Sequence, residues 1–494
     1  MRIFILGVFS AVVLNYTLKT QKGLCCTSLH LKKGGNGLMD EKDFNARDVM
    51  ETVSLLIEER DYTALRKILL DIEPQDLALL IEKCSNRELP IIFRLLPKVL
   101  AAEVFVEMES DIQHELIKLF SDKELKAVLD ELYVDDTVDL IEEMPANVVK
   151  RILHNTDNET RVFINEILKY PKDSAGSIMT VEYVRLDKNM TVADSFKRIR
   201  RVGVDKETIY TCYVTEPDKT LLGLVTVKHL LLSDEDSLIG DIMEKNIIYA
   251  TTNDDREKVA REMSKYDFLA MPVVDNEHRL VGIVTVDDAI DVLQEEATAD
   301  IEKLTGITPA YKPYLKTSVL EIWSKRVPWL LLLMVSATFT GSIITYFEGT
   351  LSKMVILTVF IPMLMGTGGN AGGQASVTII RGLSLGEITM GDIFKVVWKE
   401  SCVAILSGIA LATVGFLKFT LIDRADTITA LAVCITLIVI VVAAKFIGAV
   451  LPILAKRIGI DPVVVASPLI STLLDAISLL VYFGITTAII PQLK

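Results

Sequence analysis

The chain has 494 residues and a formal net charge of −14, and 50% of its residues are hydrophobic although 24% are charged. The charge is segregated, because residues 40–326 carry a net charge of −21 and residues 327–494 carry +2. A region this acidic argues against binding to nucleic acid or to anionic lipid, since both need basic patches. It favours cations as ligands, or it simply keeps the region soluble.

Residues 1–39 carry five basic and no acidic side chains and begin with the run MRIFILGVFSAVVLNYTL. A short apolar run after an arginine is typical of a targeting segment. We interpret residues 1–39 as sequence that precedes the natural start at Met39, with a cleaved targeting leader as the alternative. The six scattered cysteines show no paired framework and no metal-ligand spacing, which fits a reducing cytosol for the acidic region.

Residues 40–170 contain short amphipathic segments, among them YTALRKILLD, QDLALLIEKC, DIQHELIKLF and DTVDLIEEM. Each segment spaces its apolar residues as a helix does, and the segments recur about every 12 residues. A single helix of this kind cannot bury its apolar face alone, but stacked helices can. The sequence therefore predicts an α-helical solenoid as an N-terminal domain.

Residues 171–292 contain an internal repeat. TCYVTEPDKTLLGLVTVKHLLL aligns with AMPVVDNEHRLVGIVTVDDAID, and the segment before each copy also aligns. Each copy reads as helix, strand, strand and helix, with a turn between the strands. The two copies resemble cystathionine-β-synthase-type (CBS) modules, which pair side by side and often bind adenine nucleotides. This resemblance implies an α/β CBS-domain pair.

Residues 293–326 connect this pair to an apolar region, and an acidic helix is expected over 287–304. Five apolar segments follow within residues 327–494, each long enough to cross a hydrocarbon core of roughly 30 Å. Their expected bounds are 327–347, 354–380, 397–421, 429–454 and 464–489. The sequence thus predicts a multidomain protein that ends in a five-span α-helical membrane domain.

Two of these spans carry unusual polar residues. IPMLMGTGGNAGGQASVTII holds five glycines together with Asn370 and Gln374, which are four residues apart and share a helix face. Glycines allow backbones to approach closely or to unwind around a water-filled path, and freed oxygens suit hard cations. Asp475 lies about 11 residues into the last span, roughly 17 Å deep. An acid at that depth is expected to be functional, although a protonated Asp bonded to another helix is the structural alternative.

PMLMGTGGNAGGQASVTIIRGLSLGEI and SPLISTLLDAISLLVYF resemble the signature segments of the MgtE family of Mg²⁺ channels and transporters. The order of domains is also similar to that family: a helical N domain, a CBS pair, a connecting "plug" helix and five spans. The resemblance implies a homodimer of ten spans with one Mg²⁺ pore, set in the plasma (inner) membrane with cytoplasmic N-terminal domains. The proposed pore ligands are Asp475, Asn370 and Gln374.

The same resemblance implies regulatory Mg²⁺ sites between the N domain, the CBS pair and the plug helix. The positions that match are acidic: Asp135, Asp139, Asp255, Glu257, Asp267, Asp288, Glu296 and Asp300. Such faces repel one another without cations, and divalent ions bridging them would close the pore. For any one of these residues a solvated surface is the alternative.

The sequence departs from the family pattern at three places. Ala299 stands where relatives can carry an acidic ligand, and Lys445 lies within the fourth span. Lys228-His229 replaces the Arg-Asp pair of relatives that bind ATP, which argues against ATP as a cofactor. The sequence contains no Walker motif and no recognisable nucleophile–base motif, so nothing in it resembles an enzyme. The alternatives to Mg²⁺ transport are a carrier of Co²⁺ or Mn²⁺ and a membrane-anchored sensor of cations or nucleotides.

Overall fold

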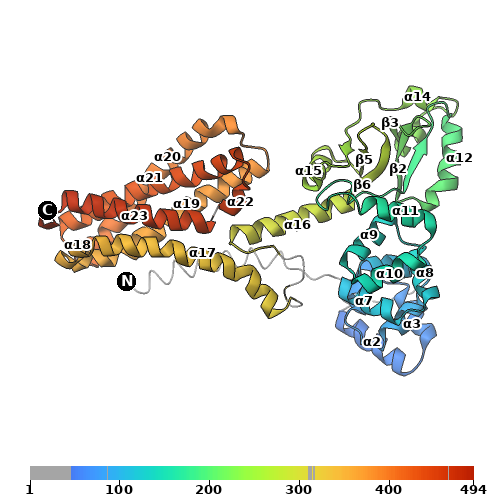
Figure 1. Ribbon diagram of the computed structural model, residues 1–494, viewed down its shortest axis with the longest axis horizontal. Coiled ribbons are helices and arrows are strands. Elements are labelled where there is room, and N and C mark those ends of the chain that lie inside the picture. Colours follow the sequence, from blue (N-terminus) through green and yellow to red (C-terminus); the bar gives the residue numbers. More distant parts are fainter. Residues whose placement is uncertain (1–45, 86, 310–313, 315–316, 466, 494) are drawn as a thin grey trace, which may run out of the picture. The chain divides into compact units, whose positions relative to one another are not determined.

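The computed structural model describes residues 46–85, 87–309, 314, 317–465 and 467–493, so the interpretation of residues 1–39 lies outside it. The chain divides into two compact units, Met1–Val292 and Leu293–Lys494, which are described separately (Figure 1).

The described part of the first unit, from residue 46 onward, starts with ten short helices. Their bounds are α2 (Ala46–Glu58), α3 (Tyr62–Leu69), α4 (Pro74–Ile81), α5 (Leu89–Leu95), α6 (Lys98–Val106), α7 (Ser110–Leu119), α8 (Asp122–Leu129), α9 (Val134–Glu143), α10 (Ala146–Asn155) and α11 (Asn158–Ile167). Most of these helices pack against the helix two positions further along the chain, as α4 does against α6, α6 against α8, α8 against α10 and α9 against α11. Apolar residues such as Leu65, Leu116 and Ile152 are fully buried between them. This stacking confirms the expected helical solenoid.

Two three-stranded sheets follow, and each has one parallel and one antiparallel pair. The strands are β1 (Tyr183–Leu186), β2 (Thr208–Thr215) and β3 (Leu221–Thr226), and β4 (Ala250–Thr251), β5 (Ala270–Val274) and β6 (Leu280–Thr285). The helices around them are α12 (Val192–Val202), the 3₁₀ turn η1 (Gly203–Asp205), α13 (Val227–Leu232), α14 (Ile239–Ile242) and α15 (Arg256–Tyr266). Equal strand order in both sheets confirms the repeat as an α/β pair of modules.

The two modules exchange their leading segments. Thr180, which precedes the first module, pairs with Ile283 in β6 of the second module, and Glu244, which precedes the second, pairs with Leu224 in β3 of the first. A shared core in which Tyr213 and Ile283 are fully buried joins the two sheets. The modules therefore form one folded body.

The helix α16 (Val286–Leu304) follows β6 directly. The remaining elements of the second unit are α17 (Val319–Tyr346), α18 (Glu348–Lys353), η2 (Val355–Phe360), α19 (Ile361–Ser384), η3 (Met390–Asp392), α20 (Ile393–Leu421), α21 (Thr427–Arg457), α22 (Pro462–Val465), α23 (Ser467–Ile489) and η4 (Pro491–Leu493).

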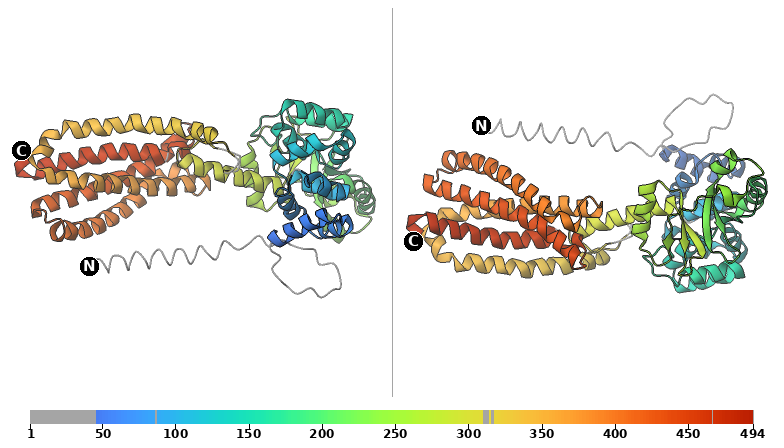
Figure 2. Two further views of the ribbon diagram at one scale, coloured as in Figure 1. Left: turned by 90° about the horizontal axis from the view of Figure 1, so that it is seen from below. Right: turned by 90° about the horizontal axis from the view of Figure 1, so that it is seen from above.

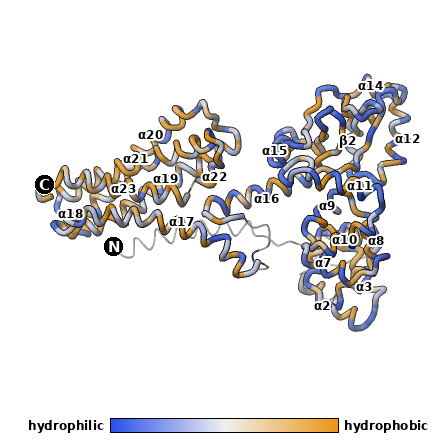
Figure 3. Tube along the Cα trace, in the orientation of Figure 1, coloured by the Kyte–Doolittle hydropathy of each residue, from blue (hydrophilic) through white to orange (hydrophobic). Residues whose placement is uncertain are grey.

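Within the described residues, five segments are long and apolar enough to cross a membrane: Val319–Tyr346, Val355–Ser384, Met390–Leu421, Thr427–Arg457 and Leu469–Ile489. Hydrophobic residues prevail along α20, α21 and α23 (Figure 3). The number of spans agrees with the sequence prediction, but several helices extend beyond the apolar segments. The first begins at Val319 rather than 327, because Ser318 caps its N-terminus through the amide of Glu321.

The glycine-rich helix α19 lies at the centre of this unit. It packs against both α21 and α23, while α20 packs against α21 and α17 against α23 (Figure 2). Phe360, Phe419, Tyr482 and Phe483 are almost fully buried in one apolar cluster among these helices. The Tyr482 hydroxyl donates a hydrogen bond to the carbonyl of Leu357, which satisfies a polar atom inside the bundle.

Candidate functional site

The glycines of α19 let two helices approach its backbone closely. A Cβ at Gly369 would lie 3.0 Å from the hydroxyl of Ser471 in α23, and one at Gly372 would lie 3.1 Å from the carbonyl of Ala444 in α21. The helix runs unbroken from Ile361 to Ser384. Close approach, rather than unwinding, is therefore what the glycines provide, and the idea of carbonyls freed from the helix is not supported.

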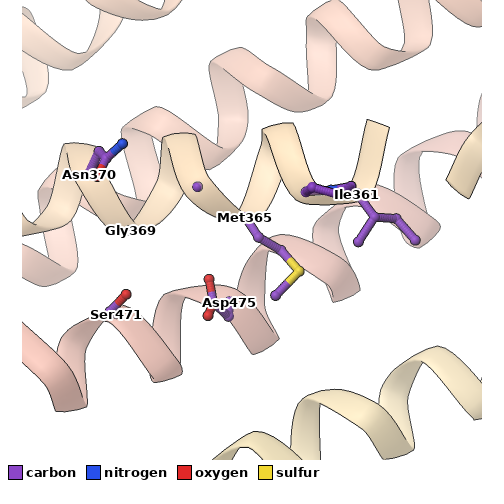
Figure 4. Close-up of a pocket in the computed structure, with 8 residues that line it drawn as sticks. Ile361, Met365, Gly369, Asn370, Ser471 and Asp475 are labelled. Atoms are coloured by element: carbon purple, nitrogen blue, oxygen red, sulfur yellow. The ribbon is translucent and has the colours of Figure 1, made fainter. Parts of the chain in front are cut away.

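A groove of about 440 Å³ opens between α19 and α23 (Figure 4). Its lining residues are Ile361, Pro362, Met365, Gly366, Gly369, Asn370, Ser471 and Asp475. Figure 4 shows the hydroxyl of Ser471 on α23 facing α19 near Gly369 and the carboxylate of Asp475 near Met365, with the side chain of Asn370 on the other edge of α19 in this view. The groove therefore contains a carboxylate, a hydroxyl and an amide next to glycine backbone. The oxygen atoms of these three side chains suit a hydrated cation.

The structure treats the three predicted pore residues differently. Asp475 is half-buried, and within the described chain no hydrogen bond or ion pair reaches its carboxylate. Asn370 and Gln374 are both exposed and lie one turn apart on α19, but only Asn370 lines the groove with Asp475.

The fourth span carries a buried charge, Lys445, which does not line the groove. Lys445 in α21 lies 3.4 Å from the carboxylate of Glu400 in α20, and the two side chains are only 8% and 15% exposed. The structure therefore pairs this departure from the family pattern with an acid of the neighbouring span. Asp475 is left as the acid without a basic partner in the groove.

A second polar site lies in the first unit, where α9 and the start of α16 meet the first CBS module. It contains Asp135, Asp136 and Asp139 from α9, Asp287, Asp288 and Asp291 from α16, and Glu182 and Glu207 from the module. We call this set the acidic cluster. The Glu207 amide donates to the carbonyl of Glu182, which holds these two residues side by side.

Burial and mutual repulsion raise the pKa values in the acidic cluster. Burial and the charges of Asp288 and Asp136 hold the pKa of Asp135 well above its usual range. Burial and the charge of Asp288 raise the pKa of Asp136 to about 7. Burial and the charge of Asp136 raise the pKa of Glu207 to about 8. Asp139 is exposed at the rim, yet lost solvent and the charge of Asp288 raise its pKa to about 7. The cluster therefore holds protons near neutral pH, or requires another cation.

Two oxygen atoms of the acidic cluster are buried without a hydrogen-bond partner, Oδ1 of Asp135 and Oε2 of Glu207. Buried polar atoms are nearly always paired, because an unpaired one costs about 1–3 kcal/mol. A divalent cation supplies the missing partner for carboxylate oxygens. In the part of the chain that the structure describes, however, no three acidic, His or Cys side chains are already arranged as a closed metal site.

Three family models match the chain. They are the MgtE divalent cation transporter model over residues 361–485, the MgtE intracellular N domain over 72–173 and the CBS domain over 175–235 and 239–295. The chain is also 36% identical over 437 residues to the magnesium transporter MgtE of Thermus thermophilus, a match that covers 87% of this chain and 96% of that protein. The chain belongs to the MgtE family.

The chain is also similar to another full-length relative and to two solved structures of soluble parts of magnesium transporters or channels. The magnesium transporter MgtE of Bacillus subtilis is 31% identical over 445 residues, which cover 89% of this chain and 97% of that protein. A crystal structure of the cytosolic domain of the Mg²⁺ channel MgtE in complex with ATP is 37% identical and has a TM-score of 0.47, over 49% of this chain and 99% of that chain. The soluble part of a magnesium transporter is 28% identical with a TM-score of 0.48, over 51% of this chain and 100% of that chain.

The remaining acidic positions suggested by the MgtE resemblance lie elsewhere. Asp255 caps α15 through the amide of Lys258, and Glu257 forms an ion pair with Arg261 in the same helix. Asp267 ends α15 in a left-handed conformation with φ of 55°. None of these three is among the charges that perturb the acidic cluster, so the structure brings only Asp135, Asp139 and Asp288 together from the predicted set in this unit.

Glu296 and Asp300 lie further along α16, in the second unit of the MgtE chain. Lys303 lies 4.0 Å from Asp300 and 3.3 Å from Asp461, which precedes α22. Leu304 packs with Ile380 of α19 and Val463 of α22. The end of α16 is thus attached to the end of α19 by an apolar contact, and to α22 and the residue before it by an apolar contact and an ion pair.

Proposed function

We propose that this protein is a Mg²⁺ channel or transporter that mediates Mg²⁺ uptake across the plasma membrane as a homodimer of ten spans. The observation that carries this proposal is the carboxylate of Asp475, which lines a polar groove among apolar spans and has no counter-charge among the residues that the structure describes. An acid in this position is costly, and such acids mark ion pathways.

The chemistry of the groove favours Mg²⁺ that keeps part of its water. Mg²⁺ loses water reluctantly and prefers octahedral oxygen ligands. One carboxylate with the hydroxyl of Ser471 and the amide of Asn370 is too few ligands for a dehydrated ion, but it suits hydrogen bonds to bound water. In a homodimer, two Asp475 side chains would repel each other until one divalent cation neutralised them. Carriers of Co²⁺ or Mn²⁺ remain the alternative, and flux selectivity separates them.

We further propose that cytosolic Mg²⁺ closes the pore by binding the acidic cluster. The raised pKa values and the two unpaired oxygens support this, because a bound cation would remove both the repulsion and the unmet partners. Asp288 lies in the first turn of α16, so a cation that bridges Asp288 to α9 would hold the beginning of that helix. The helix continues to Leu304, which packs at the ends of the spans.

The experiment that tests transport is uptake of isotopic Mg²⁺ into proteoliposomes, compared for wild type, Asp475→Asn and Glu348→Gln. Glu348 is an exposed acid at the start of α18 and serves as the matched control. We expect Asp475→Asn to reduce flux at least about tenfold, because a charge-assisted contact to the ion contributes about 1.5–3 kcal/mol, while Glu348→Gln keeps wild-type flux. Wild-type flux in Asp475→Asn would reject the pore assignment. Proteoliposomes that take up no divalent cation would favour the sensor alternative.

A further inference from the structure

The solenoid carries a basic hollow that the proposed transport function does not use. It has a volume of about 490 Å³ and is lined by Asn147, Lys150, Arg151, Leu153, His154 and Arg161. The first five come from α10 and the last from α11. Among the residues that the structure describes around it, none of the lining side chains is acidic. This composition is unexpected in a region whose net charge is −21.

The two arginines of the hollow are held in place by the fold. Arg151 donates to the carbonyls of Ile117 and Phe120 at 2.5 and 2.6 Å, and its Nε donates to Asp122 at 2.9 Å. Arg161 donates through Nη2 to the carbonyl of Thr156 at 2.8 Å. Fixed guanidinium groups lose little conformational entropy when they bind an anion.

Several donors of the hollow have no acceptor. Nε of Arg161 is buried and lacks a hydrogen-bond partner. Lys150 and His154 are exposed, and in the described chain neither forms an ion pair or hydrogen bond. Asp122 offsets part of the charge of Arg151, but its side chain is 69% exposed and does not line the hollow. The hollow therefore presents more positive charge and more donors than its own surroundings satisfy.

We propose that this hollow binds a soluble phosphate-bearing anion. Arginine forks and a lysine match the oxygens of phosphate groups, and a cavity of this size accepts a ligand with more than one such group. The region that holds the hollow carries a net charge of −21, which opposes the approach of an extended anionic lipid surface more than the entry of one small anion, so a free anion fits better than a lipid headgroup. The site lies on α10 and α11, apart from the strands and helices of the CBS pair, and it does not depend on Mg²⁺ transport.

The probe for this site is inorganic pyrophosphate, titrated calorimetrically into the full-length protein in detergent without Mg²⁺. We expect saturable binding to the wild type. Lys150→Gln/His154→Gln changes two exposed side chains without fold contacts and should weaken binding about tenfold or more, since hydrogen bonds to charged groups contribute about 1.5–3 kcal/mol. Arg161→Lys keeps the charge but loses the fork, and should weaken binding as well.

The matched control is Arg66→Gln/Lys67→Gln, which removes two exposed charges from α3 in the same domain. It should leave pyrophosphate affinity unchanged. Equal weakening in this control would mean that only the overall charge matters, and would overturn the site. Absence of saturation in the wild type at millimolar pyrophosphate would also overturn it. Binding of a polyglutamate peptide but not of pyrophosphate would replace the proposal with an acidic protein partner.

Discussion

Lys445 and Glu400 form a buried ion pair between two apolar spans, and neither residue lines the groove that contains Asp475. Each charge is buried only because the other is present. Removing one partner leaves the other uncompensated, and breaking a buried pair costs about 3–5 kcal/mol. Removing both leaves no buried charge and costs less.

We therefore expect Lys445→Met to lower the melting temperature of the protein in detergent strongly, and Lys445→Met/Glu400→Gln to recover most of the loss. Lys399→Met is the control, because Lys399 is exposed one residue before Glu400 and has no partner in the described chain. It should melt as the wild type does. A double variant as unstable as Lys445→Met would show that lost packing, and not the uncompensated charge, determines stability here.

At the acidic cluster the same residue-level reasoning predicts a dependence on pH. The folded-state pKa values of Asp136 and Glu207, about 7 and about 8, lie above the ordinary values of 3.8 and 4.5. The folded state therefore binds more protons than the unfolded state. The stability contributed by protonation is complete below the ordinary values of 3.8 and 4.5, falls as pH rises above them, and is lost once pH has passed the folded values of about 7 and about 8.

Without Mg²⁺, hydrogen exchange of α9 amides in the full chain, corrected for intrinsic rates, should show protection that falls between pH 6 and pH 8. Added Mg²⁺ should restore it about tenfold or more at pH 8, since one pKa unit corresponds to about 1.4 kcal/mol, and much less at pH 6, where protons occupy the carboxylates. Glu207→Gln should reduce both effects. Equal Mg²⁺ protection at both pH values would mean that cations and protons do not compete for this cluster.

At the scale of elements, the glycine contacts distinguish positions that look alike in the sequence. A Cβ at Gly448 of α21 would collide with the carbonyl of Gly372 in α19, and nothing lies within 4 Å of a Cβ at Gly373. A collision with backbone cannot be relieved by a rotamer change, and overpacking costs typically about 1–3 kcal/mol.

Gly448→Ala should therefore separate α21 from α19, lower the melting temperature and reduce Mg²⁺ flux. Gly373→Ala makes the same chemical change in α19 and should leave stability unchanged or slightly raised, because alanine favours helix by up to about 1 kcal/mol. Thermal melting of both variants in detergent makes the comparison. If the two variants melted alike, the close approach of α19 and α21 would not be a constraint in the folded protein.

The sequence predicted elements better than the contacts between them. Long apolar runs and the repeated strand pattern reveal spans and modules, because both are local signals. No sequence pattern around Gly448 reveals its packing role, because that role depends on which helix lies opposite. Likewise Asp135 and Asp139 share a visible helical spacing, but Glu182 and Glu207 join them only through tertiary structure. Asp136 could have been predicted as a member of the cluster from the sequence, since it too lies one helical turn from Asp139.

At the scale of the whole molecule, neutralising the acidic cluster should separate regulation from transport. Asp135→Asn/Asp136→Asn/Glu207→Gln/Asp288→Asn removes ligands and repulsion together. A ligand shifts an equilibrium only by its differential affinity for the two states, so loss of the ligands removes the response to cytosolic Mg²⁺. Asp475 is unchanged, and selectivity in the open fraction should be unchanged.

Patch recordings at low and high cytosolic Mg²⁺ measure this directly. The matched control is Asp255→Asn/Glu257→Gln, which neutralises two acids of α15 outside the acidic cluster. The pore of this control variant should still close at the Mg²⁺ concentration that closes the wild-type pore. Closure of the cluster variant at that same concentration would place the regulatory cation elsewhere.

The exchange of leading segments between the two CBS modules also bears on how the chain arose. Thr180 crosses to the second sheet and Glu244 crosses to the first, and glycines at equivalent places, Gly282 and Gly223, make room for the crossing strands. Reciprocal contacts of this kind are those of a two-fold symmetric dimer that swaps an identical arm. The pair thus has the form that a homodimer of single modules would take if its one gene were duplicated and the copies were fused. Each module uses the arm of the other to complete its sheet, so we expect deletion of either copy to destabilise the one that remains.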